Sequence, residues 1–419
     1  MSDAAVISKR SSLAVLMASG VVAVTTLLVT VISSRVLAPT QNAEFLVFWS
    51  FFNAVIATIA GLRNEATRAV AALDAAGGVR PPGVRVMSVA AVWGGIAAVV
   101  WVASAAWWLR TLLPGTAAIV VAVGAAACLA YAGQVVLSGA QAGVGQWNHY
   151  AGVNITEAVV RVALMAVVAL VGATLESLQL AVAGASVAWL AYLVVFRSSR
   201  QAVTLHADVA LPRLTRNGGL AMLSAAAYAV LVSGFAALLR LVVGDAVAAS
   251  DLAVLVLAVM VTRAPVLMPL MAFQPVAISA FLRRPGHGLR TLGIVCALLV
   301  AGGAVVASLV GLVGPWLVRA IFGAAYSMSA WQLGSLTAAA VPLAMLTVSG
   351  SAVLAIGGHR SYSVGWVCAA VVTAILLFVP LALFDRVAFA MAIGPLCGMV
   401  PHLLVIYRHE SASTVQQIG

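Results

Sequence analysis

The chain has 419 residues, of which 64% are hydrophobic and only 8% are charged. Because a soluble domain carries about 25% charged and about 45–50% apolar residues, this composition excludes a soluble domain, a nucleic-acid-binding domain and a disordered chain. The 22 basic residues outnumber the 11 acidic ones and give a net charge of +11. In a membrane protein such an excess is first expected in the cytoplasmic loops.

Twelve apolar runs have about the length, close to 20 residues, that a helix needs to cross a bilayer. Turn-forming sequences such as Pro81-Pro82-Gly83 separate them. The first run is longer than the apolar core of a signal peptide, so we expect it to be retained as a helix. In chain order, the runs are centred on residues 13–34, 45–70, 87–109, 117–138, 150–172, 179–196, 219–242, 250–274, 291–313, 333–355, 363–383 and 387–407.

The distribution of basic residues predicts the orientation. With a cytoplasmic N-terminus, thirteen of them fall in cytoplasmic segments, five in outer loops and four inside spans. This asymmetry follows the positive-inside rule. We therefore expect a multi-pass protein of the bacterial cytoplasmic (inner) membrane, with both termini in the cytoplasm.

A polar stretch from Arg197 to Asn217 divides the twelve runs into two sets of six. An internal repeat supports this division, because run two ends in the sequence 66–69 (ATRA) and run eight contains 261–264 (VTRA). We predict an all-α integral membrane protein with two pseudo-symmetric six-helix lobes. The N-terminal lobe spans 1–197, a cytoplasmic linker 198–216, and the C-terminal lobe 217–419 with a short cytoplasmic tail. Paired repeats of this kind are typical of transporters, whose substrate site lies between the repeats.

Ionisable residues inside spans are costly, so each is a candidate functional residue. In run two, helical spacing places Asn64, Glu65 and Arg68 on one face, with Arg63 to one side. In run five, Tyr150, Asn154, Glu157 and Arg161 form a second stripe at steps of four, three and four. Run eight adds Arg263.

Two interpretations of these charges are open. The pairs Glu65–Arg68 and Glu157–Arg161 fit self-satisfied ion pairs that hold helices together. However, four arginines against two glutamates leave a surplus of two positive charges. An unpaired buried charge is expensive, whereas a guanidinium binds a phosphate or pyrophosphate bidentately. The surplus therefore favours an anionic ligand.

Other polar residues carry weaker signals. His149, His359 and His402 lie near expected membrane boundaries without zinc-ligand spacing, and proton transfer by any of them is a minor hypothesis. Asp251 and Glu44 lie near the outer ends of runs eight and two, where interfacial solvation is the simpler role. We expect no metal site, no cofactor and no catalytic residues, and leave H⁺ or Na⁺ coupling open.

Four short segments resemble motifs of polysaccharide exporters. The segment 33–45 (SSRVLAPTQNAEF) resembles their first loop, and 61–68 (GLRNEATR) resembles their polar second helix. The segment 320–326 (AIFGAAY) resembles their F-G-x-x-Y motif, and 357–360 (GGHR) resembles their turn between helices ten and eleven. These exporters are the Wzx-like branch of the multidrug/oligosaccharidyl-lipid/polysaccharide (MOP) flippase superfamily, whose MATE-like fold the resemblance implies for this chain.

The resemblance implies a flippase that moves a polyprenyl-(pyro)phosphate-linked sugar or oligosaccharide from the inner to the outer leaflet by alternating access. Such a protein serves cell-envelope and cell-wall polysaccharide biosynthesis and performs no covalent chemistry. The expected phosphate contacts are Arg63, Arg68, Arg161 and Arg263. The residues expected to orient them, or to couple ions, are Asn64, Glu65, Asn154 and Glu157.

A MATE-like multidrug or cation antiporter is the main alternative, although its site should carry an excess of carboxylates. A polytopic glycosyltransferase is a weaker alternative, because the chain has no Asp-Asp or Asp-Glu pair and its first outer loop is short. A membrane scaffold without transport is the other. We expect a monomer that contacts the lipid-linked glycan and membrane lipids and binds no nucleic acid. Glycosyltransferases or a polymerase of the same pathway are its candidate protein partners.

Overall fold

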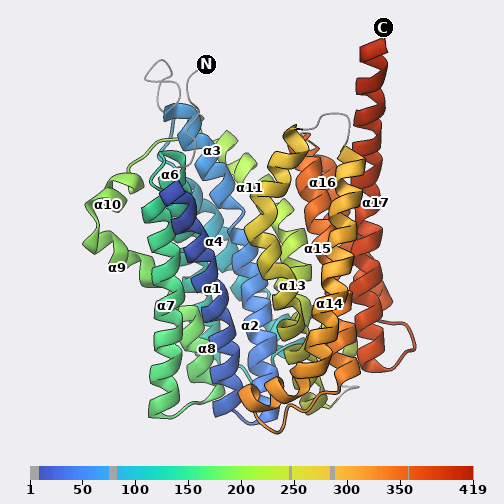
Figure 1. Cartoon of the computed structure of the whole chain (residues 1–419). Helices are drawn as coiled ribbons and strands as arrows, with labels where there is room; N and C mark the ends of the chain where they lie inside the picture. Colours follow the sequence, from blue (N-terminus) through green and yellow to red (C-terminus); the bar gives the residue numbers. More distant parts are fainter. Residues whose placement is uncertain (1–8, 75–82, 245–247, 284–287, 357, 419) are drawn as a thin grey trace. The chain divides into compact units, whose positions relative to one another are not determined.

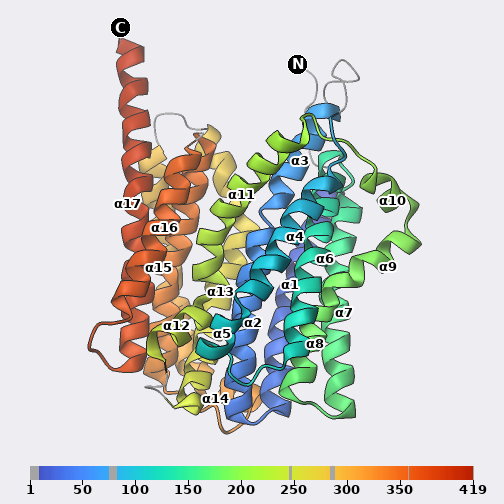
Figure 2. The same cartoon turned by 180° about the vertical axis from the view of Figure 1, so that it is seen from behind.

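The computed structural model describes residues 9–74, 83–244, 248–283, 288–356 and 358–418. Helices make up nearly all of this part of the chain (Figures 1 and 2). Only helices satisfy every backbone hydrogen bond within one apolar segment, which explains why these runs fold this way. The helices are α1 (Lys9–Val36), α2 (Pro39–Ile59), α3 (Leu62–Asp74), α4 (Met87–Ala103), α5 (Ala105–Thr111), α6 (Ala118–Gly143), α7 (Trp147–Val171), α8 (Leu175–Gly184), the short 3-10 helix η1 (Ala185–Val187), α9 (Ala188–Val195), α10 (Arg197–Val203), α11 (Leu211–Val232), α12 (Phe235–Val243), α13 (Ala249–Arg283), α14 (Gly288–Phe322), α15 (Ala330–Ala355), α16 (His359–Leu376) and α17 (Leu383–Ile418).

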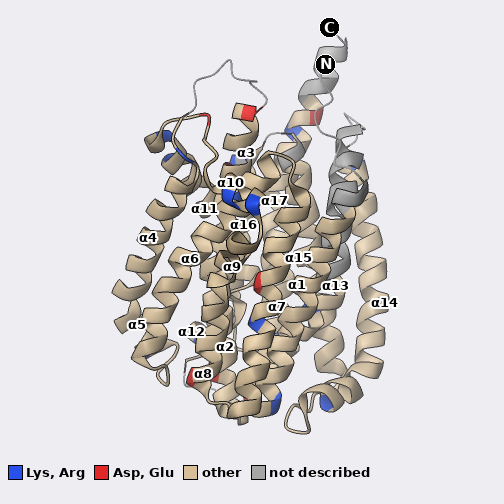
Figure 3. Ribbon diagram, turned by 90° about the vertical axis from the view of Figure 1, so that its left-hand side faces the viewer, with Lys and Arg blue, Asp and Glu red and all other residues tan. Residues whose placement is uncertain are grey.

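The twelve predicted runs each correspond to an apolar helix or helix pair. Among the described residues, nine helical segments are long and apolar enough to cross a membrane. Two more runs are bent pairs, α4–α5 with a 53° bend and α11–α12 with a 66° bend, and the shorter apolar helix Arg360–Leu376 accounts for the eleventh run. Charged residues lie mainly near helix ends, and a few lie midway along the helices (Figure 3). The predicted fold class, an all-α integral membrane protein, is confirmed.

Two compact units make up the chain, residues 1–237 and 238–419. In the first unit, α1 packs against α7, and α6 packs against both α3 and α4. Small residues allow these helices to approach closely, as is usual in membranes. A Cβ atom added at Gly139 of α6 would lie 2.6 Å from the carbonyl oxygen of Arg63 in α3. This contact sets the position from which Arg63 extends.

Helix α11 belongs to the first unit, where it packs against α2, α3 and α4. The approach is again close, since a Cβ atom at Gly61 would lie 2.6 Å from the carbonyl oxygen of Ala221 in α11. Trp93 of α4 donates from Nε1 to the carbonyl oxygen of Thr215 at 3.0 Å. The lobe boundaries predicted from the internal repeat remain a prediction.

The polar stretch before α11 is anchored by its backbone. After α10, an extended segment pairs with residues 83–86 through an antiparallel bridge between Arg85 and His206. The N–H of Gly83 donates to the carbonyl oxygen of Ala207, and the N–H of Ala207 donates to that of Val84, both at 2.8 Å. The segment therefore has a fixed register in the first unit.

In the second unit, α15 packs against α13, α14 and α17, and α16 packs against α17. Glycines again allow close approach, because a Cβ atom at Gly398 of α17 would lie 2.5 Å from the carbonyl oxygen of Gly365 in α16. Buried side chains from α14, α15 and α17, such as Leu292, Val348 and Ile406, form one core cluster. The unit is thus held by the same small-residue packing as the first.

Candidate functional site

The stripe predicted on run five lies on α7 and holds a buried ion pair. Arg161 donates from Nη2 to Glu157 Oε1, one helical turn away, and both side chains are buried. The guanidinium of Arg161 also lies over the ring of Trp49 from α2, 5.0 Å from its centroid. A cation over an aromatic face is attracted by the ring quadrupole. Glu157 and Trp49 therefore hold Arg161 from two sides.

Arg63 extends from α3 toward the same helix. Its Nη2 donates to Asn154 Oδ1 at 3.4 Å, which is longer than the usual 2.9–3.0 Å of such a bond. Its guanidinium lies over the ring of Tyr150, 5.6 Å from the centroid, and its Nε has no hydrogen-bond partner among the described residues. Asn154 is itself held by a bond from Nδ2 to the carbonyl oxygen of Tyr150 at 2.7 Å. Arg63 is thus positioned but only weakly bound.

We call Arg63, Tyr150, Asn154, Glu157 and Arg161 the buried arginine cluster. It contains two guanidinium groups and one carboxylate. Tyr131 of α6 lies within electrostatic range of both arginines and of Glu157. Because Glu157 is paired with Arg161, the cluster carries one uncompensated positive charge, that of the half-buried Arg63. An unpaired charge inside a bilayer is costly.

Arg68 lies in a different environment, in the middle of α3. Its Nε and Nη2 donate to the carboxylate of Glu65 at 2.8 and 2.6 Å. Its Nη1 and Nη2 also donate to both oxygens of Asp208 at 3.0 and 3.1 Å. Asn217 donates from Nδ2 to Glu65 Oε1 at 3.0 Å. Arg68 is 44% exposed, and two carboxylates pair with it.

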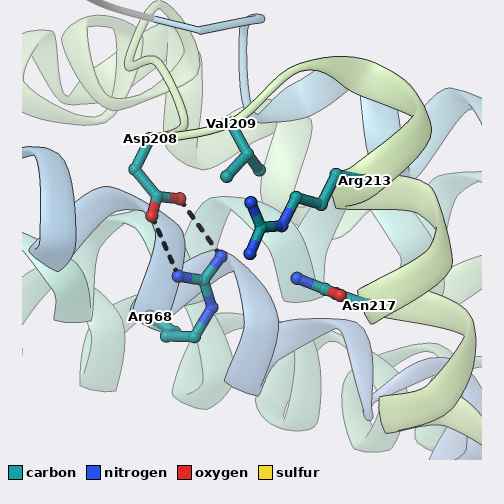
Figure 4. Close-up of a pocket in the computed structure, with 5 residues that line it drawn as sticks. All are labelled: Arg68, Asp208, Val209, Arg213 and Asn217. Carbon is teal, nitrogen blue, oxygen red and sulfur yellow. Dashed lines mark hydrogen bonds and ion pairs between the residues drawn. The ribbon is translucent and has the colours of Figure 1, made fainter. Parts of the chain in front are cut away.

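Arg68 also lines an open pocket of about 380 Å³. Figure 4 shows the guanidinium of Arg213 and the amide of Asn217 extending from α11 toward Arg68. We call this the exposed arginine pocket. Its lining residues are Arg68, Asp208, Val209, Arg213 and Asn217.

The structure therefore separates residues that the sequence grouped together. It joins Arg63 with the α7 stripe, and it pairs Arg68 with Glu65, but no described contact joins these two groups. Asn64 is exposed on α3 and contacts neither. Arg263 is buried in α13 of the second unit, at 8% exposure.

Three contributors were missed by sequence reasoning. Asp208 lies in what we treated as a polar linker, 140 residues from Arg68. Trp49 and Tyr131 lie in apolar runs, where an aromatic residue gives no signal of its own. The sequence signal that could have suggested Asp208 is its position as the one acidic residue in the arginine-containing stretch 197–217.

The weaker candidates have ordinary surroundings where their side chains are described. His149 contacts the hydroxyl groups of Tyr192 at 3.1 Å and Ser198 at 2.7 Å. His402 is buried and contacts Ser349 Oγ at 2.9 Å. Asp251 is exposed, and the side chain of His359 lies outside the described residues. Among the described residues, no group of three His, Cys, Asp or Glu side chains could hold a metal ion.

Comparison with known proteins gives sequence relatives and structural neighbours. No protein-family model matches this sequence. It is 36% identical over 378 residues to "Uncharacterized protein Rv1510" of Mycobacterium tuberculosis, covering 90% of this chain and 87% of that one. It is 35% identical over 384 residues to "Uncharacterized protein Mb3654" of Mycobacterium bovis, covering 90% and 88%.

The structural neighbours are transporters at low sequence identity. An inward-facing multidrug resistance MATE family transporter of the MOP superfamily matches with a TM-score of 0.70 and 16% identity, over 96% of this chain and 99% of that one. An outward-facing structure matches with a TM-score of 0.67, 17% identity and coverage of 96% and 95%. A third, from Pyrococcus furiosus, is described as a MOP superfamily transporter in which reverse polarity of the binding pocket suggests a different function; its TM-score is 0.58 at 15% identity, over 96% of this chain and 95% of that one. These matches show the fold.

Proposed function

Because this chain belongs to the same family as the mycobacterial proteins Rv1510 and Mb3654 and has the fold of MATE transporters, we propose that it is a flippase of the Wzx-like branch for a polyprenyl-(pyro)phosphate-linked sugar or oligosaccharide. It would move this lipid from the inner to the outer leaflet of the cytoplasmic membrane for cell-envelope polysaccharide synthesis. The observation that carries the proposal is the surplus of arginine over carboxylate in the buried arginine cluster.

Arg63 is the residue we propose to bind the phosphate first. A guanidinium has five N–H donors, and the contacts of Arg63 are one long bond to Asn154 and the face of Tyr150. Its side chain is partly exposed rather than sealed in the core. A phosphate oxygen pair would engage two of the remaining donors and neutralise the surplus charge, which makes binding favourable in a site of low dielectric constant.

Arg161 would add a second positive charge, held in place by Glu157 and Trp49. In this proposal Glu157 and Asn154 orient the two arginines and do not contact the lipid. For the second unit, the buried Arg263 is the corresponding candidate. Arg68 is not assigned to this function, because among the described residues it contacts no member of the buried arginine cluster.

An antiporter for organic cations is the competing function, and it is equally consistent with the fold. Such a protein needs a buried carboxylate that is available to H⁺, Na⁺ or the drug. In the first unit, the buried Glu157 is engaged by Arg161 and the buried Glu65 by Arg68. This engagement favours an anionic substrate over a cationic one.

The test is reconstitution of the full chain in liposomes with a fluorescent polyprenyl-diphosphate oligosaccharide. The measurement is the fraction of labelled glycan that becomes accessible to a membrane-impermeant quencher over time. We expect Arg63→Gln to slow transfer by about tenfold or more, as loss of a charged hydrogen bond implies. The exposed arginine variant Arg110→Gln is the matched control and should transfer at the wild-type rate.

A variant with both charges of the buried ion pair removed distinguishes loss of transport from loss of folding. The double variant Glu157→Gln with Arg161→Gln removes both charges together, so it leaves no unpaired ion in the core. If this variant is stable but inactive, the charge is needed for transport. Wild-type transfer by both this variant and Arg63→Gln would overturn the proposal, as would proton-coupled export of an organic cation without lipid transfer.

A further inference from the structure

The exposed arginine pocket has features of a ligand site that the proposed flippase activity does not use. Four of its five lining residues are polar or charged, and it lies between α3 and the beginning of α11 (Figure 4). All of its lining residues belong to the first unit. It is therefore a pocket of one compact body, separate from the buried arginine cluster.

Arg68 is held firmly in this pocket and still has a donor to spare. Four of its N–H groups bond to the carboxylates of Glu65 and Asp208. A guanidinium has five donors, so one on Nη1 is left. The side chain is 44% exposed while both carboxylates are buried. The accessible part of the network is therefore the guanidinium, and the carboxylates fix its orientation.

Arg213 supplies the second guanidinium. Glu65 and Asp208 carry two negative charges, and Arg68 carries one positive charge. Arg213 therefore brings the network to zero net charge, and the two guanidinium groups are its accessible part. The exposed side chain of Arg213 makes no hydrogen bond or ion pair within the described part of the chain, and its guanidinium extends into the pocket. Two guanidinium groups that face one space give the fork-like donor pattern that planar or tetrahedral oxyanions accept.

Hydrogen bonds from neighbouring segments hold both sides of the pocket in place. The backbone N–H of Asp208 donates to the carbonyl oxygen of Ala69 at 3.2 Å, and its neighbour Ala207 pairs with Val84. On the other side, Trp93 fixes the first turns of α11 through Thr215. Both halves of the pocket thus keep their places without a ligand.

We propose that this pocket is a second binding site, specific for a phosphate or diphosphate group held between Arg68 and Arg213. Asp208 is a positioning residue that orients Arg68, and its negative charge limits the affinity. The group would come either from a soluble phosphate compound or from a lipid headgroup at the membrane surface.

The test uses isothermal titration calorimetry to measure binding of inorganic pyrophosphate to the purified full-length protein in detergent. We expect Arg213→Gln to weaken binding by at least about fivefold, since the arginine is exposed and partly screened. Arg216→Gln is the matched control, because it removes the same charge from an exposed position of α11 that does not line the pocket. Asp208→Asn keeps a hydrogen-bond acceptor and removes a negative charge, so it should tighten binding.

The outcomes are decisive in both directions. An equal loss of pyrophosphate affinity in Arg213→Gln and Arg216→Gln would show that binding depends on general surface charge, and would overturn the proposed site. Loss in Arg63→Gln with retention in Arg213→Gln would assign pyrophosphate to the buried arginine cluster and also overturn it. If the site is real, nanodiscs containing a polyprenyl phosphate identify the source: competition with pyrophosphate supports a lipid headgroup, and its absence supports a soluble compound. Failure here leaves the flippase test unaffected, because that test uses Arg63 and Arg161.

Discussion

The buried arginine cluster and the exposed arginine pocket contain similar side chains in opposite settings. In the cluster, the buried Arg161 is paired with Glu157, whereas the half-buried Arg63 makes one long bond to Asn154. In the pocket, Arg68 alone has two carboxylates and is 44% exposed. Water and counter-ions make an exposed ion pair worth little, whereas a buried one is costly to break. The number of carboxylates per arginine and the access of water thus decide how much each charge matters.

The largest loss of stability should come from breaking the buried ion pair between Glu157 and Arg161. Replacing Arg161 by Met leaves the Glu157 carboxylate buried without its cation, which costs about 3–5 kcal/mol. Thermal unfolding of the purified protein should show a clear drop in midpoint. The double variant Glu157→Gln with Arg161→Gln should recover much of that drop. An unchanged midpoint for Arg161→Met would mean that water reaches the pair and that the cluster is no different from the pocket.

A smaller effect is expected at the glycine contact that positions Arg63. In Gly139→Ala, the new methyl group would lie 2.6 Å from the carbonyl oxygen of Arg63. The backbone must shift, which costs about 1–3 kcal/mol, and glycan transfer should fall with it. Gly95→Ala in α4, where a Cβ atom meets nothing within 4 Å, is the control. If both variants behave alike, the position of α3 does not govern the cluster.

The smallest effect should be found at Arg68. Its replacement by Gln removes ion pairs whose cation is 44% exposed, and Gln can still donate a hydrogen bond to the buried carboxylates of Glu65 and Asp208. The loss in free energy of unfolding should therefore be smaller than that of Arg161→Met. The same unfolding measurement checks this, and raising the salt concentration should reduce the difference further because exposed charges are screened. A loss as large as that of Arg161→Met would erase the contrast between the two sites.

The sequence predicts much of the fold because lipid imposes one solution on each apolar run. Hydropathy located all twelve runs, but it gave no sign of the 53° bend between α4 and α5. There, Ser104 donates from Oγ to the carbonyl oxygen of Val100 at 2.6 Å. Such side-chain bonds compete with the helix and are associated with bends, and whether one does so depends on surrounding packing.

For the candidate sites, local spacing predicts contacts within one helix and little else. The steps of four and three on α7 correctly placed Glu157 beside Arg161. The threonines of the two repeated Thr-Arg pairs make the same local contact. Thr67 and Thr262 each donate to the carbonyl oxygen four residues earlier, at 2.9 and 2.7 Å. Yet Arg68 is 44% exposed while Arg263 is buried. The difference depends on neighbours from distant parts of the chain, which spacing cannot supply.

The extended segment before α11 has a consequence for how this family can diverge. Its register is set by backbone groups of residues 83–86 and 205–207, and a backbone hydrogen bond does not depend on which side chain is attached. Most positions in it should therefore tolerate substitution without losing their place, except where proline would remove a donor. Two relatives could therefore have the same backbone path in this segment although their sequences there differ. Asp208 is the position at which substitution would remove a side-chain contact, the ion pair with Arg68.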